Sequence, residues 1–332
     1  MIGAAQPNRS RARRLGSVVA GSVRLPLLAL LLAGSTGMAA AQDVVIGLTA
    51  WPSAKVSAYV IGQVLAERTG VTPVYVERGS VGLLTSIVQG DMDVYPELWS
   101  PNLDAAIDRA GAAVTISPHA VTGRQGICAT RAAVDQTGIK AVSDLTNPDI
   151  AAAFDSDDDG RGELWIGDAS WFSTQVEQVR ARSAGYDKTM QLLQMPEDLA
   201  MAAVDASVAL AQPMVFYCYS PHHVFVLHDV VMLAEPAFDA AAWQLVAPAE
   251  DANWLQHSRA GTAWDVSSLS IAFATRLNSE LPAVADVLDR IQFEPEDLAG
   301  MSYALQVERK SPEDAARGWL AAHRDRMDGW FE

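Results

Sequence analysis

The stretch Met92-Asp93-Val94-Tyr95-Pro96-Glu97-Leu98-Trp99-Ser100-Pro101-Asn102 is the most informative part of this chain. Its β-branched and aromatic residues predict a short strand over 93–95, which we expect Pro96 to end. A carboxylate, an indole and a second proline then lead into a helix. Because open α/β sheets bind ligands at the carboxyl ends of their strands, Glu97 and Trp99 are candidate ligand groups. Taken alone, they also fit a solvated acid and a core tryptophan.

The amino-terminal residues indicate export. Residues 1–41 combine arginines with a short apolar segment, Leu25 to Ala33, and end in Ala39-Ala40-Ala41 before Gln42. This pattern predicts a signal peptide that is cleaved after about Ala41. The apolar segment is too short to span a bilayer stably, so we expect a periplasmic protein.

The charge of the chain disfavours nucleic acid as a partner. The 332 residues carry a formal net charge of −16, and the leader holds five arginines and no acid, so its removal gives −16 − 5 = −21. Such a surface repels nucleic acid and anionic lipid and mildly favours cationic ligands. Export also permits a disulfide between Cys128 and Cys218, although their spacing leaves the pairing open.

Strands alternate with helices along most of the chain, which predicts βαβ units and an α/β fold. The pattern predicts short strands over 113–116 and 127–130 and helices over 172–184 and 312–327. It loosens around 122–126, where we place a crossover to a second domain, and the run 267–274 is expected to return as a strand. We therefore expect two domains, each a doubly wound and mainly parallel sheet. Domain I comprises 42–123 plus 268–332, domain II comprises 124–267, and a ligand cleft lies between them.

Four aromatic residues occupy the same position relative to predicted strands. Trp51 follows a strand ending at 49, Trp99 one ending at 95, Trp171 one ending at 167 and Tyr219 one ending at 218. Two belong to each expected domain. Core aromatics are expected to be scattered along strands and helices, whereas residues at strand exits of facing domains line a shared cleft. The pattern therefore predicts an aromatic cage.

Such a cage suits a quaternary ammonium group, which spreads its charge over methyl groups and has no N–H to donate. Ring faces hold it by cation–π attraction, on the order of 0.5–2 kcal/mol each. Glu97 could add a negative charge beside the cation. A zwitterion would also need donors for its carboxylate, and the helix start at 171–174 with Arg78, Ser80 and Asn102 are candidates.

The acidic run 155–163 has the spacing of a calcium loop. Positions 1, 3, 5 and 9 carry acids, position 6 is Gly160 and position 7 would contribute a backbone carbonyl. Position 12 is Ile166, so the usual bidentate glutamate is missing. We predict a structural Ca²⁺ site that is formed by Asp155, Asp157, Asp159, Arg161 and Glu163. An isolated acidic turn without a metal is the alternative.

The same motifs resemble a known family. The segments 90–101, 154–171 and 213–221, together with Gly318-Trp319-Leu320 and Asp328-Gly329-Trp330, are similar to the periplasmic substrate-binding proteins of ABC importers for glycine betaine and related amines. The resemblance covers nearly all of the chain after the leader. It implies a two-domain clamshell with a two-strand hinge that delivers its ligand to a membrane permease.

The resemblance also assigns ligand-binding roles to residues of this chain. It places the family's cage on Trp99, Trp171 and Tyr219, with Trp51 as a fourth wall. Many relatives carry tryptophan at the position of Tyr219, and relatives that bind trimethylamine N-oxide have an acid near the cage, as Glu97 is here. Glycine betaine, trimethylamine N-oxide, choline, carnitine and dimethylsulfoniopropionate are the ligands that this likeness leaves open.

Two other classes of protein are alternatives to a transport protein. An exported enzyme acting on a small cationic metabolite is one, but the sequence lacks G-x-S-x-G, H-E-x-x-H and C-x-x-C motifs. The only histidine pair, His222-His223, is not expected to bind zinc because adjacent histidines usually point apart. A ligand-sensing periplasmic receptor is the other alternative. We expect no catalytic activity and no catalytic cofactor.

Overall fold

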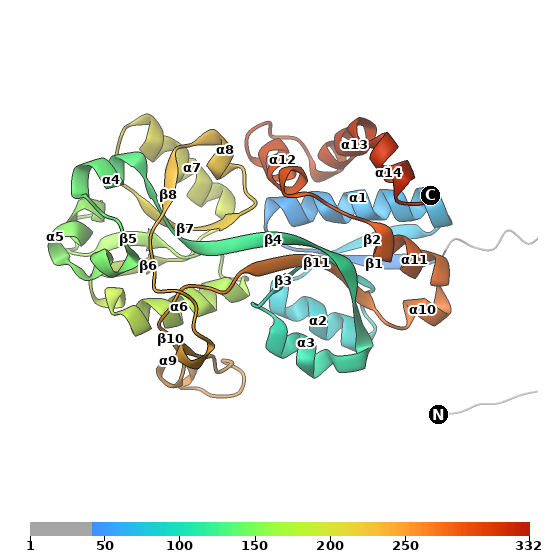
Figure 1. The fold of residues 1–332 in the computed structure, drawn as a ribbon, viewed down its shortest axis with the longest axis horizontal. Coiled ribbons are helices and arrows are strands. Elements are labelled where there is room, and N and C mark those ends of the chain that lie inside the picture. Colours follow the sequence, from blue (N-terminus) through green and yellow to red (C-terminus); the bar gives the residue numbers. More distant parts are fainter. Residues whose placement is uncertain (1–41) are drawn as a thin grey trace, which may run out of the picture. The chain divides into compact units, whose positions relative to one another are not determined.

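The computed structural model describes residues 42–332, so the predicted leader over 1–41 lies outside the described part. Two lobes are joined by two long strands, β4 and β11 (Figure 1). We call the lobe that contains β1 to β3 lobe I and the lobe that contains β5 to β8 lobe II.

Lobe I is built from the first βαβ units and from the carboxyl-terminal helices. Helices α1 and α12 to α14 cover one side of its sheet, and α2 and α3 lie on the other (Figure 1). Its elements are β1 (Asp43–Leu48), α1 (Pro52–Thr69), β2 (Thr72–Glu77), α2 (Ser80–Gln89), β3 (Val94–Ser100), α3 (Asp104–Ala110), β11 (Ser267–Ala274), α10 (Leu277–Glu280), α11 (Pro282–Arg290), α12 (Pro295–Gln306), α13 (Pro312–Ala322) and α14 (Arg324–Gly329).

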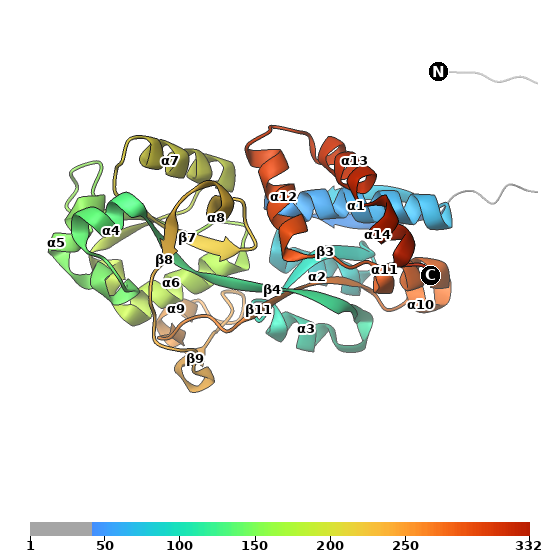
Figure 2. The ribbon, with the colours of Figure 1, turned by 45° about the horizontal axis from the view of Figure 1, so that its top comes forward.

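Lobe II begins within β4 and ends before β11. A short two-stranded sheet of β9 and β10 lies beside α9 at its edge (Figure 2). Its elements are β4 (Val114–Thr130), α4 (Arg131–Thr137), α5 (Pro148–Ala151), β5 (Gly162–Trp165), α6 (Phe172–Ala184), β6 (Met190–Leu193), α7 (Glu197–Ala209), β7 (Val215–Ser220), α8 (Val224–Leu227), β8 (Val230–Met232), β9 (Trp243–Gln244), α9 (Trp254–His257) and β10 (Arg259–Ala260).

The strands follow the order β2-β1-β3-β11-β4-β7-β5-β6, with β8 paired to β4. Strand β1 runs parallel to β2 and β3, and β5 runs parallel to β6 and β7. Antiparallel pairing connects the two lobes, because β4 pairs with β11 up to Gly123 and with β7 from Arg124 onward. The predicted α/β architecture with mainly parallel sheets is confirmed, and the exact domain bounds stay a prediction.

Strand β3 differs from the prediction. We expected Pro96 to end it at Tyr95, but β3 continues to Ser100. Its partner β11 shifts register between Ser270 and Ala272, opposite Pro96 and Glu97. A bulge of this kind accommodates a residue without an N–H donor, so the proline interrupts the pairing without ending the strand.

Three further parts of the chain differ from the prediction. The expected separate strands over 113–116 and 127–130 are the two ends of one strand, β4, because neighbours in both lobes supply its backbone partners. The helix α12 was not predicted, and the single helix expected over 312–327 is divided into α13 and α14 near His323.

A disulfide links β4 to β7. Cys128 and Cys218 are bonded, their Cα atoms are 5.7 Å apart, and both side chains are buried. The two cysteines are therefore paired, which their spacing in the sequence could not show.

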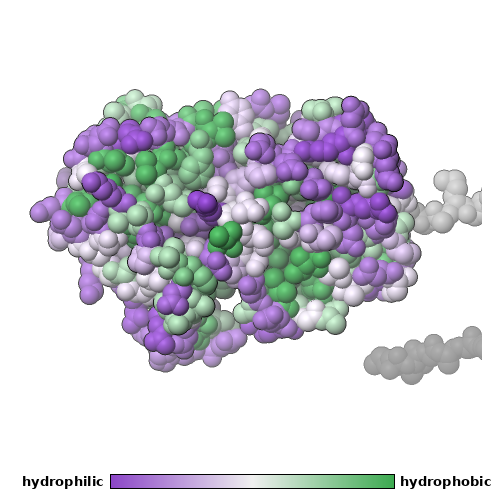
Figure 3. Space-filling model, in the orientation of Figure 1, coloured by the Kyte–Doolittle hydropathy of each residue, from purple (hydrophilic) through white to green (hydrophobic). Residues whose placement is uncertain are grey.

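The face seen in Figure 3 mixes both kinds of residue, with hydrophilic ones over α12 to α14 and hydrophobic ones gathered over α2. Within 42–332, no helix combines the length and the apolar character needed to cross a membrane.

Candidate binding site

Two of the predicted cage residues stand at the starts of helices. Trp51 is the N-cap of α1, with Pro52 at the first helical position, and Trp171 is the N-cap of α6. Each indole therefore lies in the turn that follows a parallel strand, β1 or β5. This is the edge of an open α/β sheet at which ligands bind.

The other two predicted cage residues lie within strands. Trp99 is the next-to-last residue of β3 and Tyr219 the next-to-last residue of β7, and each precedes a Ser-Pro pair. We expected both residues to follow their strands. The difference arises because β11 and β4 extend the pairing of β3 and β7 beyond the predicted strand ends.

The four aromatic side chains converge. The ring centroids of Trp51 and Trp171 are 6.2 Å apart, those of Trp99 and Tyr219 are 5.4 Å apart, and both pairs meet edge to face. Trp171 and Tyr219 complete the arrangement at 6.0 Å. Trp51 and Trp99 belong to lobe I, and Trp171 and Tyr219 belong to lobe II. The first two ring contacts therefore connect the lobes, and the third connects two elements of lobe II.

All four rings line one pocket. Their side chains are 4 to 7% exposed, so the pocket is largely shielded from water. The remaining lining residues are Ser80, Tyr95, Asn102, Leu103, Gln125, Phe172, Ser173 and Tyr217.

Glu97 is buried behind the rings and is not among the lining residues. Its Oε1 accepts hydrogen bonds from Trp51 Nε1 at 2.7 Å, Ser53 Oγ at 3.1 Å and Trp99 Nε1 at 3.1 Å. Its Oε2 is buried without a partner among the described residues. The carboxylate thus fixes the orientation of both lobe I indoles.

The environment of Glu97 disfavours its negative charge. Burial raises the pKa of Glu97 to about 7, although the hydrogen bonds from Trp51, Ser53 and Trp99 oppose the shift, and the charge of Glu197 adds to it. No ion pair to Glu97 occurs among the described residues. An ionised Glu97 therefore lacks a counter-charge from the protein.

One polar network lies at the pocket, and sequence reasoning identified only part of it. Gln125 and Asn102 form a pair of amide hydrogen bonds of 2.7 and 2.9 Å. The Gln125 amide also donates to Ser267 Oγ at 2.8 Å and accepts from the Tyr217 hydroxyl at 2.7 Å. Tyr217 could have been found from its position two residues before Tyr219, which places both side chains on one face of β7.

The predicted donors have different outcomes. Ser80, Asn102 and Ser173 line the pocket, whereas Arg78 is exposed and its guanidinium donates to the Glu77 carbonyl. The backbone N–H of Phe172 donates to Ser80 Oγ at 3.1 Å, which also joins the two lobes. No lysine or arginine is among the residues that line the pocket.

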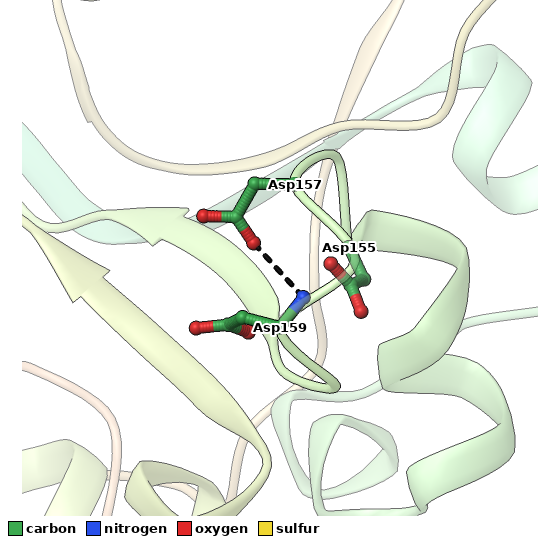
Figure 4. Close-up of side chains that lie close together, drawn as sticks. All are labelled: Asp155, Asp157 and Asp159. Atoms are coloured by element: carbon green, nitrogen blue, oxygen red, sulfur yellow. Dashed lines mark hydrogen bonds between the residues drawn. The ribbon is translucent and has the colours of Figure 1, made fainter.

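The predicted calcium loop is partly assembled. Carboxylate oxygens of Asp155, Asp157 and Asp159 lie within 4.8 Å of one another (Figure 4). The carboxylate of Glu163 instead accepts from the Ser156 N–H, at 2.9 Å from Oε2. The Arg161 side chain bonds to the carbonyls of Asp187 and Met190.

Backbone donors organise the same loop. Gly160 N–H donates to Asp155 Oδ2 at 2.8 Å, and Arg161 N–H donates to Asp159 Oδ1 at 2.9 Å. Gly160 has φ 89°, a left-handed conformation that glycine adopts at little cost. The donor set of three hard carboxylate oxygens is compatible with Ca²⁺.

The family model for the substrate binding domain of ABC-type glycine betaine transport systems matches residues 42–322. The chain belongs to this family. It is 22% identical over 258 residues to the glycine betaine/proline betaine-binding periplasmic protein of Salmonella typhimurium strain LT2, a match that covers 75% of this chain and 76% of the relative. The protein of the same description from Escherichia coli K12 is 24% identical, with 74 and 76% covered.

Solved structures of the family share the fold. Lactococcal OpuAC in its closed, glycine betaine-bound form aligns with a TM-score of 0.67 at 18% identity, covering 88% of this chain and 100% of that one. An ABC-transporter choline-binding protein in complex with choline also gives 0.67, at 15% identity, with 87 and 91% covered. Family members are thus two-domain binding proteins of transport systems.

Proposed function

We propose that this protein is the solute-binding component of an ABC importer and captures a methylated ammonium compound between its lobes. The observation that carries the proposal is the convergence of Trp51, Trp99, Trp171 and Tyr219 on one shielded pocket that no lysine or arginine lines. At about 0.5–2 kcal/mol for each ring face, such a cage accounts for much of the roughly −8 kcal/mol that micromolar binding requires.

The charges around the cage favour a ligand with a net positive charge. Glu97 lies behind Trp51 and Trp99, and the hydroxyl of Tyr219 donates to the buried Glu197 at 2.7 Å. A cation supplies the counter-charge that Glu97 lacks, whereas the carboxylate of glycine betaine would meet acids without a basic partner. Among the ligands considered, we therefore place choline-like compounds ahead of trimethylamine N-oxide, carnitine, dimethylsulfoniopropionate and glycine betaine.

The polar end of the ligand has donors available. Trp171 Nε1 and the Tyr95 hydroxyl are buried, belong to lining residues, and have no hydrogen-bond partner among the described residues. Asn102 uses one of its two amide hydrogens on Gln125, which leaves one for a ligand oxygen. A single hydroxyl is satisfied by this set.

The domain arrangement and the partner are part of the proposal. We place domain I at 42–123 plus 268–332 and domain II at 124–267, because β4 changes partner between Gly123 and Arg124 and β11 begins at Ser267. In the periplasm, the ligand-bound form is then recognised by an ABC permease of the inner membrane. We assign no chemical step to the protein, so we expect the ligand to be unchanged after incubation with it.

Calorimetric titration of cage variants tests the proposal. We expect Trp99→Ala and Trp171→Ala each to weaken choline binding at least about tenfold, since each removes a ring face worth roughly 1–2 kcal/mol. Trp254→Ala in α9 is the matched control, because this half-buried tryptophan does not line the pocket. Wild-type titration curves from both cage variants would remove the rings from the binding site.

A structural Ca²⁺ at Asp155, Asp157 and Asp159 is a separate proposal, supported by the convergence of their oxygens ahead of β5. Glu163 and the Arg161 carbonyl would complete the site only if Glu163 leaves the Ser156 N–H. Chelation should lower the melting temperature of the wild type but not of Asp157→Asn. Asp251→Asn, which alters a distant acid, should respond like the wild type. Absence of calcium from dialysed protein would contradict the proposal.

A further inference from the structure

His222 and His223 follow the end of β7 and are both buried, although the binding site described above uses neither of them. Their ring centroids are 4.2 Å apart. The two side chains nevertheless make contacts in different directions. One contacts the network behind the cage, and the other contacts the opposite lobe.

His223 makes a hydrogen bond between the lobes. Its Nδ1 lies 2.7 Å from the Oγ of Ser302, and both residues are buried, at 3 and 0% exposure. His223 immediately precedes α8 in lobe II, and Ser302 belongs to α12 in lobe I (Figure 2). This contact is separate from the strands β4 and β11 that join the lobes.

His222 connects the same dipeptide to the cage. Its Nδ1 accepts the Val224 N–H at 3.2 Å, and its Nε2 lies 2.9 Å from Glu197 Oε1. The hydroxyl of Tyr219 donates to that same oxygen at 2.7 Å, and the rings of Tyr219 and His222 are 4.8 Å apart. A cage wall and the contact between the lobes are therefore adjacent through His222.

We propose that the His223–Ser302 hydrogen bond is a latch that holds the lobes together around the ligand, and that protonation of His223 in acid opens it. The proposal rests on the proposed function, because it assumes that the lobes separate to admit a ligand. The hydrogen bond alone tolerates a protonated ring. The burial of His223 disfavours a protonated ring, because no carboxylate among the described residues forms an ion pair with His223 to compensate the charge.

The groups around His223 support an opening of the latch in acid. Burial lowers the pKa of His223 to about 3, and the charges of His222 and His228 lower it further. On α7, Glu197 is paired with His222 and Asp205 with His228, and α12 presents the neutral Ser302. An exposed His223 in separated lobes has the ordinary pKa near 6.5, so opening takes up a proton below that pH.

The linkage predicts a measurable loss of affinity. Well above pH 6.5 neither form binds the proton and the latch is intact, whereas as the pH falls through 6.5 the open form is progressively favoured. For a histidine with a pKa near 6.5 in the open form, the loss at pH 5.0 is about 30-fold. Above pH 7.5 this histidine contributes no pH dependence.

Choline titrations at pH 7.5 and 5.0 with wild type, His223→Gln and His257→Gln test the latch. We expect the wild type and His257→Gln, which alters an exposed histidine, to lose far more affinity in acid than His223→Gln does. His223→Gln and Ser302→Ala should each speed ligand dissociation, and the double variant should add little to either. Equal acid losses in wild type and His223→Gln would overturn the proposal.

NMR titration of ring-labelled His223 gives a second readout if a variant folds poorly. The ring should stay neutral down to pH 5.0 with choline bound, and a pKa of His223 near 6.5 in that complex would overturn the latch. These outcomes are distinct from failure of the proposed function. If the wild type binds no methylated ammonium compound at all, the proposed function fails before the latch is tested.

Discussion

At the scale of single residues, Glu97 has the most unusual environment in the site. One buried oxygen accepts from two indoles and a hydroxyl, and the other has no partner among the described residues. Indole N–H groups that donate to a carboxylate leave their ring faces more electron-rich, which strengthens cation–π attraction. We therefore propose that Glu97 acts on the ligand through Trp51 and Trp99.

Removing the charge of Glu97 while keeping its shape tests this role. In Glu97→Gln, the amide oxygen can still accept from both indoles, so we expect the fold and cage to persist. Choline binding at pH 8 should weaken about tenfold, which corresponds to roughly 1.4 kcal/mol of lost electrostatic attraction. Glycine betaine binding should change less, because its own carboxylate is relieved of a nearby acid.

The pH dependence of choline binding tests whether Glu97 acts in its ionised form. With a pKa of about 7, ligand-free Glu97 is mostly ionised at pH 8 and mostly protonated at pH 6. Because a bound cation favours only the ionised form, wild-type affinity for choline should fall as pH drops through about 7. Calorimetry should find this loss reduced in Glu97→Gln, and an identical profile would contradict the role of Glu97 as counter-charge.

Single residues also show how much of the site could be predicted from the sequence. The convergence of the four aromatic residues could be predicted because the approximate ends of strands are local features, although Trp99 and Tyr219 lie within β3 and β7. The position of Glu97 behind the rings, and the link from Tyr217 to Gln125, were not found. They depend on how β3, β4 and β7 lie against one another, which local patterns do not specify.

At the scale of elements, β4 connects the lobes at the cage. A Cβ on Gly123 would lie 2.8 Å from the Ser220 carbonyl oxygen, 2.7 Å from Leu269 Cδ1 and 3.2 Å from Trp99 Cζ3. The glycine therefore allows β4, β7, β11 and a cage ring to approach closely. Any side chain here displaces at least one of them.

Gly123→Ala should weaken ligand binding because the added methyl group pushes on Trp99 and on the backbone of β7. We expect about a tenfold loss in affinity, or roughly 1.4 kcal/mol, by calorimetry, with a lowered melting temperature. Gly300→Ala in α12 is the control, since a Cβ there meets no atom within 4 Å. Wild-type affinity in Gly123→Ala would show that this close approach does not position Trp99.

Elements with strong local signals were predicted well. The helix over 172–184 and the strand over 267–274 have the predicted bounds, because a glycine ends the first and apolar residues fill the second. The continuation of β3 past Pro96 depends on its bulge opposite Ile271 of β11, and the length of β4 depends on partners in both lobes. These partners are distant in sequence, so local patterns could not reveal them.

At the scale of the whole molecule, the two lobes contribute different parts of one pocket. Lobe I supplies Trp51 and Trp99, and lobe II supplies Trp171 and Tyr219. Neither lobe alone surrounds a methylated cation, so binding requires that the lobes approach each other. The acidic surface, with a net charge of −16 for the full chain, adds a mild long-range attraction for a cation.

The central claim is that rings from both lobes bind a positive charge that is covered by methyl groups. Choline and 3,3-dimethylbutan-1-ol have the same shape, but only choline carries the charge, so comparing their dissociation constants by calorimetry isolates the cation–π contribution. For three to four ring faces we expect choline to bind at least about 30-fold more tightly, or roughly 2 kcal/mol. Equal affinities for the two compounds would contradict the account.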